Sequence, residues 1–224
     1  MLFRSAMFFA IELLRTVEAL HKAGILHGDL KADNVLVRLG AGGGAAWSAQ
    51  YAADGSAGWS EQGVALIDFG RGVDMKVFRP DVQFIADWKT GPQDCAEMRE
   101  LRPWTFQIDY HGLAGILHSM LFGRYMETVA DARAALPGQG AGKRWRCKEG
   151  MKRYWQGEIW GDCFDLLLNP TAHVEGEEGG KMPVLRGMKE VRERMEGWVG
   201  ANCERGVGLQ SMLRKLENSI QGRK

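Results

Sequence analysis

The chain has 224 residues, of which 45% are hydrophobic and 25% charged, a composition typical of a globular domain with one sizeable core. Lys and Arg (29) nearly balance Asp and Glu (28), so the net charge of +1 gives no argument for a nucleic acid or an anionic membrane as partner. The four cysteines are scattered without a C-x-x-C pair, which argues against a zinc site and a disulfide framework.

The first predicted element is an amphipathic helix over about residues 7–22, which Gly24 would end, because its apolar residues recur at spacings of three and four. Residues 7–11 have the apolarity of a signal sequence, but Glu12 and Arg15 interrupt them and no cleavage site of small residues follows. No stretch approaches the length of a membrane span. We therefore expect a soluble protein of the cytosol or the nucleus.

The stretch H-G-D-L-K-A-D-N (27–34) follows this helix and carries the residue types that phosphoryl transfer from ATP requires. A carboxylate positions the attacking hydroxyl, a cation neutralises charge on the moving phosphoryl group, and oxygen ligands hold Mg²⁺. Asp29, Lys31 and Asn34 stand in the order H-x-D-x-K-x-x-N, a close match to the protein-kinase catalytic loop. Residues 35–38 are then predicted to form a strand.

A Gly-, Ala- and Ser-rich segment separates this stretch from the next motif, since these types make up fifteen of residues 41–60. Such a composition buries little apolar surface, and we interpret 39–62 as an inserted flexible loop. Trp47, Tyr51 and Trp59 are expected to attach the loop to the surface of the domain, with a binding role for these aromatics as the alternative.

The second motif is Asp68-Phe69-Gly70, which ends the apolar run 64–67 and supplies a metal-binding carboxylate in kinases. An ordinary polar turn would explain either motif alone. The occurrence of both in this order, each attached to an apolar strand, favours a kinase-like site. Residues 68–98 lack periodicity and are predicted to form a long structured loop.

The remainder of the chain is predicted to be mostly helical. Residues 108–123 are apolar on nearly every side, which is typical of a helix at the centre of a core. A flexible, Gly- and Ala-rich bend at 128–146 would precede three or four further helices. Apolar residues at helical spacing mark two of their faces, namely Met188, Val191, Met195 and Trp198, and Leu209, Met212, Leu213 and Leu216. The predicted fold class is α+β, a mostly helical lobe with a small β-hairpin at its active edge.

Over nearly the whole chain beyond about residue 7, the sequence resembles the C-terminal lobe of a eukaryotic protein kinase. More narrowly, it resembles the Bub (budding uninhibited by benzimidazole) mitotic spindle-checkpoint serine/threonine kinases. The narrower resemblance rests on five strings: H-G-D-L-K-A-D-N, I-D-F-G-R-G-V-D-M (67–75), C-A-E-M (95–98), P-W-T-F-Q-I-D-Y-H-G (103–112) and, after it, M-L-F-G-R-Y-M (120–126).

The resemblance implies that residues 1–224 form a protein-kinase C-terminal lobe with an activation segment at 68–98. It implies ATP and Mg²⁺ as cofactors, a protein Ser or Thr as acceptor, checkpoint and kinetochore proteins as partners, and a location in the nucleus at the kinetochore. It implies no nucleic acid or membrane partner.

The resemblance also implies roles for single residues. Asp29 would accept the proton of the substrate hydroxyl or orient that hydroxyl, and Lys31 would contact the γ-phosphate of ATP. Asn34 and Asp68 would bind Mg²⁺, and Leu36 would form the floor under the adenine ring.

Further residues would support this site. His27 and Phe69 would pack together in a hydrophobic spine, and Asp109 would hold the backbone of the catalytic loop, a role compatible with that of a capping residue at a helix start. Thr90 lies seven residues before Glu97, a spacing that implies contact with the catalytic Asp and Lys and favours Ser/Thr over Tyr as acceptor.

The first departure from the kinase pattern is Gly28, which stands where an Arg usually precedes the catalytic Asp. That Arg normally pairs with a phosphorylated activation loop. Residues 68–98 contain no Ser or Tyr and one Thr. We therefore predict a segment that folds without phosphorylation, held by internal packing of Val77, Phe78, Phe84, Ile85 and Trp88.

Two further departures concern Glu97 and the N-terminal lobe. Cys95-Ala96-Glu97 replaces Ala-Pro-Glu, and residues 169–173 (N-P-T-A-H) replace D-P-x-x-R, so Glu97 would pair with His173 and favour its charged form. The Gly-rich loop, strand lysine and helix glutamate of an N-terminal lobe are absent before Met7. Because positioning of ATP supplies most of catalysis, we expect this chain alone to be inactive.

Two other functions remain open. A small-molecule phosphotransferase of the aminoglycoside or choline kinase type also carries H-G-D near I-D-F, but usually has His where this chain has Lys31. A pseudokinase or scaffold lobe would not need Asp29, Lys31, Asn34 and Asp68, although the absence of an N-terminal lobe favours it.

Overall fold

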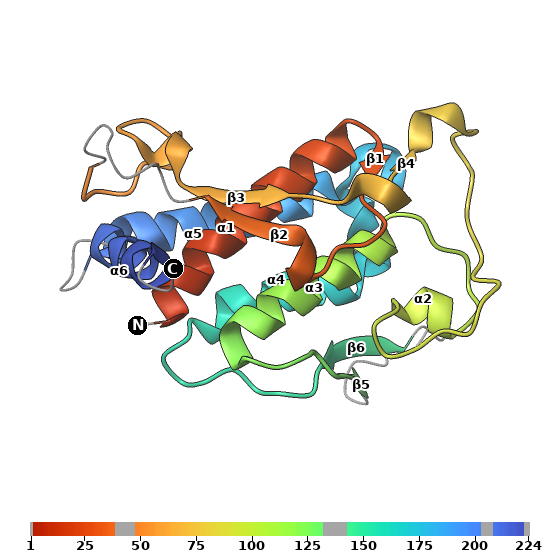
Figure 1. The fold of residues 1–224 in the computed structure, drawn as a ribbon. Coiled ribbons are helices and arrows are strands. Elements are labelled where there is room, and N and C mark those ends of the chain that lie inside the picture. Colours follow the sequence, from red (N-terminus) through yellow and green to blue (C-terminus); the bar gives the residue numbers. More distant parts are fainter. Residues whose placement is uncertain (1, 39–47, 132–142, 203–207, 222–224) are drawn as a thin grey trace.

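The computed structural model describes residues 2–38, 48–131, 143–202 and 208–221. Within these ranges the helices are α1 (Leu2–Lys22), α2 (Ala96–Arg99), α3 (Gln107–Phe122), α4 (Gly157–Leu168), α5 (Leu185–Asn202) and α6 (Leu209–Gln221). Short strands pair antiparallel as three two-stranded sheets: β1 (Ile25–Leu26) with β4 (Val73–Asp74), β2 (Val35–Arg38) with β3 (Gly63–Leu66), and β5 (Thr128–Asp131) with β6 (Arg144–Cys147). Figure 1 shows α1, α3, α4 and α5 packed together, with the β2–β3 hairpin crossing in front of α1.

Helix α1 begins earlier than the predicted residue 7, because the apolar pattern continues toward the N-terminus. Phe3 packs against Trp155 and Trp198, with ring centroids 6.3 and 5.3 Å away. The helix ends as predicted, since Gly24 takes a left-handed conformation (φ +75°) that glycine adopts without strain. Its buried face packs against α3 and α5. Helix α1 is thus a core element that leads to residues 27–34, called the catalytic stretch below because of its predicted role.

Helix α3 is largely buried, as predicted for a helix at the centre of the core, and packs against α1 and α4. Both polar and apolar side chains of its first three turns are buried, among them Asp109, Tyr110 and Leu113. A Cβ atom on Gly112 would lie 2.4 Å from the carbonyl oxygen of Leu30. Glycine at this position therefore allows α3 to touch the backbone of the catalytic stretch.

The predicted bend at 128–146 is wrong at both ends, where the chain forms the β5–β6 hairpin. The pairing runs from Thr128 opposite Cys147 to Asp131 opposite Arg144. β-branched and aromatic residues favour strands at these ends, whereas the Gly and Ala on which the prediction rested lie mainly in 132–142, outside the described residues. The hairpin is held to the helices through Asn169, which bonds the backbone N–H and carbonyl of residue 145.

The insertion at 39–62 is partly described. Residues 39–47, including Trp47, lie outside the described residues. In the remainder, Tyr51 and Trp59 are buried, with ring centroids 6.2 and 5.6 Å from that of Phe8 on α1. The prediction that aromatic residues attach the insertion to the domain is confirmed for these two. The flexibility of 39–62 as a whole stays a prediction.

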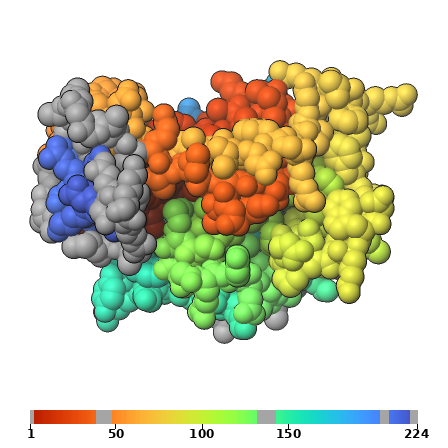
Figure 2. Space-filling view, in the orientation of Figure 1, coloured from red at the N-terminus to blue at the C-terminus, as the bar shows by residue number. Residues whose placement is uncertain are grey.

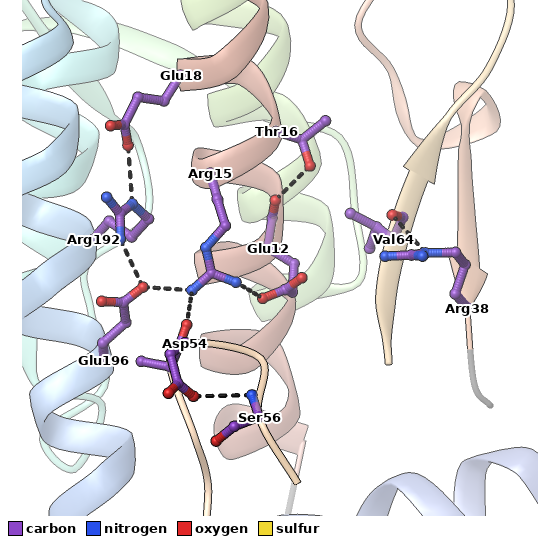
Figure 3. Close-up of polar contacts among 11 residues, drawn as sticks. Glu12, Arg15, Thr16, Glu18, Arg38, Asp54, Ser56, Val64, Arg192 and Glu196 are labelled. Carbon is purple, nitrogen blue, oxygen red and sulfur yellow. Dashed lines mark hydrogen bonds and ion pairs between the residues drawn. The ribbon is translucent and has the colours of Figure 1, made fainter. Parts of the chain in front are cut away.

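A network of charged side chains joins α1 to α5 (Figure 3). Arg15 binds Glu12 at 2.5 Å and Glu196 at 2.6 Å, while Arg192 binds Glu18 at 2.9 Å and Glu196 at 2.7 Å. Burial raises the pKa of Glu12, although Arg15 opposes the shift. Arg15 also donates to a backbone carbonyl of the insertion, so one guanidinium links both helices and the inserted loop.

The two apolar faces predicted near the C-terminus are confirmed. In α5 and α6 six of the eight predicted side chains are buried and two are partly buried against the same core, the partly buried ones being Trp198 and Leu216. Among the described helices, none combines the length and apolarity that crossing a lipid bilayer requires. The observed architecture agrees with a mostly helical lobe that carries small sheets.

Candidate active site

The catalytic stretch brings an acid, a cation and an amide together between β1 and β2. The Lys31 ammonium lies 2.7 Å from Oδ2 of Asp29, and the Asn34 amide donates to the backbone carbonyl of Asp29 (2.9 Å) and to its Oδ2 (3.2 Å). Partial burial alone would raise the pKa of Asp29, but the bonds from Lys31 and Asn34 outweigh it and hold that pKa below its ordinary value. Asp29 is thus kept as a carboxylate.

Asp109 fixes the backbone ahead of this cluster. Its carboxylate is fully buried and accepts hydrogen bonds from the backbone N–H of His27 and of Gly28, both at 2.8 Å. The Nε2 atom of His21, at the end of α1, lies 3.0 Å from the same carboxylate. The cap position of α3 is occupied by Phe106, so Asp109 holds the catalytic stretch rather than capping the helix. The expected holding role of Asp109 is confirmed by these contacts.

The structure explains why glycine stands at position 28. Gly28 has φ +77°, and a Cβ atom there would lie 2.4 Å from the carbonyl oxygen of Arg71. The guanidinium of Arg71 lies 4.0 Å from Oδ1 of Asp29. A second cation therefore approaches Asp29 from the segment after Asp-Phe-Gly, and sequence reasoning missed it. Its only sequence signal is that Arg71 directly follows that motif.

Asp68 reaches the cluster because β3 pairs with β2. The backbone N–H of Ile67 donates to the carbonyl of Asn34 at 3.0 Å, beyond the last ladder pair. Asp68 itself adopts a left-handed conformation (φ 63°), which is uncommon for a residue other than glycine, and its Oδ1 accepts from the N–H of Gly70 at 3.4 Å. The two motifs that lie far apart in the sequence thus meet at one edge of a hairpin.

The predicted contact between His27 and Phe69 is confirmed. Their ring centroids are 4.6 Å apart, and Nε2 of His27 lies 3.0 Å from the carbonyl oxygen of Ile67. His27 is fully buried while Phe69 is partly exposed. The packing ties the Asp-Phe-Gly motif to the residue that Asp109 holds.

The residues present fit Mg²⁺ and ATP. Asn34 uses its N–H₂ group on Asp29, which leaves its amide oxygen, and Asp68 engages one carboxylate oxygen with Gly70. Carboxylate and amide oxygens are the ligands that Mg²⁺ prefers. Leu36 lies on β2, directly after the catalytic stretch, and is 52% exposed, so its side chain offers an apolar surface for a planar ring.

The expected contact of Thr90 with the catalytic residues is not among the hydrogen bonds of the described residues. It makes no hydrogen bond to Asp29 or Lys31 in the part of the chain that the structure describes, and Lys31 is paired with Asp29 instead. The proposed role of Thr90 therefore stays a prediction.

The predicted packing within the activation segment is confirmed for Phe78 and Phe84, whose ring centroids are 5.6 Å apart, although Phe78 is partly exposed. It is wrong for Val77, Ile85 and Trp88, which are exposed. Phe84 also packs against Trp104, with ring centroids 5.1 Å apart and a pair of 2.9 Å backbone hydrogen bonds between the two residues. Pairing of β4 with β1 holds the start of the segment. Backbone pairing and two aromatic contacts of Phe84 therefore take the place of most of the predicted cluster.

The predicted pair between Glu97 and His173 is also wrong. Buried Glu97 lies 3.6 Å from Arg102, and the Nε2 atom of His173 lies 3.0 Å from Oδ2 of Asp165, which Arg144 also binds. Burial would raise the pKa of Asp165, but His173 and Arg144 hold it well below its ordinary value. His173 pairs with Asp165, eight residues before it, and the β5–β6 hairpin brings Arg144 to the same carboxylate.

Comparison with known proteins identifies similar sequences, although the chain matches no protein-family model. It is 49% identical over 210 residues to the spindle assembly checkpoint serine/threonine-protein kinase bub1 of Schizosaccharomyces pombe, covering 94% of this chain and 19% of that protein. It is 42% identical over 191 residues to the BUB1 protein of the same description from Saccharomyces cerevisiae, covering 85% of this chain and 17% of that protein. The chain thus spans about a fifth of the length of these relatives.

A solved structure extends the comparison to the fold. The crystal structure of the BubR1 kinase domain matches with a TM-score of 0.62 and 30% identity, over 89% of this chain and 52% of that one. The chain therefore has a protein-kinase-like fold that corresponds to part of a kinase domain. The resemblance to BUB1-family checkpoint kinases is confirmed over most of the chain.

Proposed function

We propose that this chain, similar over most of its length to the BUB1-family spindle-checkpoint kinases, is the lobe of such a kinase that carries its catalytic loop. In the complete kinase it would transfer the γ-phosphoryl group of ATP to a Ser or Thr hydroxyl of a protein. The observation that carries this proposal is the cluster of Asp29, Lys31 and Asn34 on a backbone that Asp109 holds.

The roles follow from charge and geometry. Asp29, held as a carboxylate, orients the acceptor hydroxyl and takes its proton as the oxygen bonds to phosphorus and the bond to the leaving oxygen of ADP breaks. Lys31 leaves Asp29 to bind the phosphoryl oxygens, and Asn34 and Asp68 ligate the metal. When bound, ATP supplies the phosphoryl group and Mg²⁺ neutralises its charge. Leu36 supports the adenine ring, and Thr90 closes on Asp29 and Lys31 in the active state.

Turnover is proposed to need the remaining part of a kinase domain, because the chain corresponds to about half of one. The test joins this chain to the part of the fission yeast relative that completes its kinase domain outside the matched region, and measures transfer from γ-labelled ATP to protein and to small alcohols. Labelled protein Ser or Thr is expected, and Asp29→Asn is expected to abolish the labelling. Asp81→Asn changes an exposed carboxylate and serves as the matched control.

The proposal fails if the chimera folds, as judged by circular dichroism, and does not label protein, or if Asp29→Asn labels as fast as the parent. Preferred labelling of choline or an aminoglycoside would favour a small-molecule phosphotransferase instead. Checkpoint and kinetochore proteins are the proposed partners and the kinetochore the proposed location, by similarity to the relatives. Imaging of a tagged protein in dividing cells tests the location.

A scaffold role is a second candidate, and one observation favours it. Val77 (73%) and Ile85 (60%) expose most of their side chains on the activation segment, with Phe78 and Trp88 partly exposed beside them. Exposed apolar groups of this density are typical of contact surfaces. In that case Asp29→Asn would leave the cellular role intact, whereas a polar substitution of Ile85 would remove it.

A further inference from the structure

Arg99, the last residue of α2, is a partly buried cation without a carboxylate partner within the described ranges. Its guanidinium donates to the hydroxyl oxygen of Thr128 at 3.0 Å and lies 4.6 Å from the centre of the Trp145 ring. The Nε–H group of Arg99 is buried and has no hydrogen-bond partner among the described residues. A buried donor without an acceptor costs free energy, so this position favours an additional acceptor group.

The β5–β6 hairpin presents Thr128 and Trp145 to Arg99 on one face. The register places Thr128 opposite Cys147, two positions along β6 from Trp145, and side chains alternate between the faces of a strand. The indole N–H of Trp145 is buried and likewise has no hydrogen-bond partner in the described chain. Arg146, between these two positions of β6, projects from the opposite face.

The positive charge of Arg99 is not cancelled by the acidic residues beside it. Glu97 and Glu100, which belong to the same short helical turn, lie 3.6 and 2.8 Å from Arg102 instead. Burial lowers the pKa of His111 to about 4, and the charge of Arg99 adds to that shift. A cation that acts on its neighbours in this way is available to an added anion.

We propose that Thr128 is a phosphorylation site whose phosphate binds Arg99. A phosphate carries about −1.5 to −2 charges at neutral pH and three acceptor oxygens, which match a guanidinium with an unused N–H group. Thr128 begins the four-residue strand β5 and follows Tyr125 (90% exposed) and Glu127 (63% exposed side chain), so a modifying enzyme reaches it from solvent. The threonine oxygen bonds to the γ-phosphorus of ATP as the bond to ADP breaks, and the hydroxyl proton passes to the base of the modifying kinase.

The phosphate would hold the end of the activation segment against the hairpin. Residues 68–98 contain no Ser or Tyr and one Thr, so a phosphate on β5 acts on this segment from outside it. Figure 2 shows the activation segment, in yellow, beside α3, in green, on one face of the molecule, and β5 follows α3 in the chain. The inference stands apart from the proposed function, because any ATP-dependent protein kinase supplies the phosphoryl group.

The experiment compares the chain carrying threonine at position 128 with the chain carrying phosphothreonine, incorporated there during translation. Urea unfolding and the rate of proteolysis within 68–98 are the readouts. Because a hydrogen bond to a charged group is among the stronger ones, phosphorylation should lower the equilibrium constant of unfolding about tenfold and slow the cleavage. Arg99→Gln should remove both effects and Arg99→Lys should keep part of them. Arg146→Gln removes a guanidinium from the other face of the hairpin and, as the matched control, should keep both in full.

Mass spectrometry of the protein isolated from dividing and from resting cells tests whether the site is used, and phosphate on Thr128 is expected in one of the two. Its absence from both overturns the inference. The inference is also overturned if phosphothreonine at position 128 destabilises the chain, or if Arg99→Gln and Arg146→Gln respond equally to the phosphate.

Discussion

Replacement of Gly28 by alanine would test the backbone geometry that holds the catalytic stretch. Two costs are expected. A residue other than glycine at φ +77° loses about 1–2 kcal/mol of unfolding free energy. The added Cβ atom would also lie 2.4 Å from the carbonyl oxygen of Arg71, and relieving such overpacking typically costs about 1–3 kcal/mol more. Together these terms predict a loss of about 2–5 kcal/mol.

Gly123 separates the two terms. It has φ +68°, but a Cβ atom there meets nothing within 4 Å. Gly123→Ala should therefore lose only the conformational term of about 1–2 kcal/mol. Urea unfolding followed by tryptophan fluorescence measures both variants against the parent. If Gly28→Ala costs no more than Gly123→Ala, contact with the Arg71 carbonyl does not explain the glycine, and the argument fails.

Four further predictions concern stability. Asp109→Ala leaves two backbone N–H groups buried without acceptors and should cost about 3 kcal/mol or more in urea unfolding; a loss below about 1 kcal/mol would contradict the holding role. Trp59→Ala should cost about 3–5 kcal/mol if the insertion is anchored as described, and retention of full stability would argue against it. Phe84→Ala should speed proteolysis within 68–98, because it removes the contact with Trp104. Val77→Ala, at an exposed site, should change the unfolding free energy by less than about 0.5 kcal/mol and serves as the comparison. If the two variants are cleaved at the same rate, the predicted difference is wrong. Asp165 has a folded pKa below its ordinary value of 3.8, so its stabilising contribution is complete above that pH and is lost as the pH falls toward the folded pKa. Asp165→Asn should therefore reduce the dependence of the unfolding free energy on pH at acid pH. An unchanged dependence would contradict the pairing with Arg144 and His173.

Local sequence patterns predicted the parts of the site that depend on close spacing. Asp29, Lys31 and Asn34 lie within one stretch of six residues, so their meeting needed no knowledge of the fold. The burial of α3 also followed from its own apolar residues. Asp109 was assigned through the family resemblance, because nothing in its neighbourhood reveals a backbone 82 positions away as its partner.

Partner choice across long sequence distances was less predictable. The predicted pair joined residues 76 positions apart, whereas Glu97 pairs with Arg102 and His173 with Asp165, each within eight residues in the sequence. The predicted burial of side chains in the activation segment was wrong for a related reason. Apolar residues indicate burial only when a partner surface is present, and the described chain offers one to Phe84 but not to Val77.

The fully buried Asp109 carboxylate has a consequence for the motions of the catalytic stretch. Loop amides usually exchange with solvent through small local openings. Those of His27 and Gly28, however, donate to the buried carboxylate of Asp109 on α3. Opening either one would expose a buried carboxyl group that also faces His21 of α1. Their exchange with deuterium should therefore be as slow as that of the core helices, so that this loop and the core unfold as one cooperative unit.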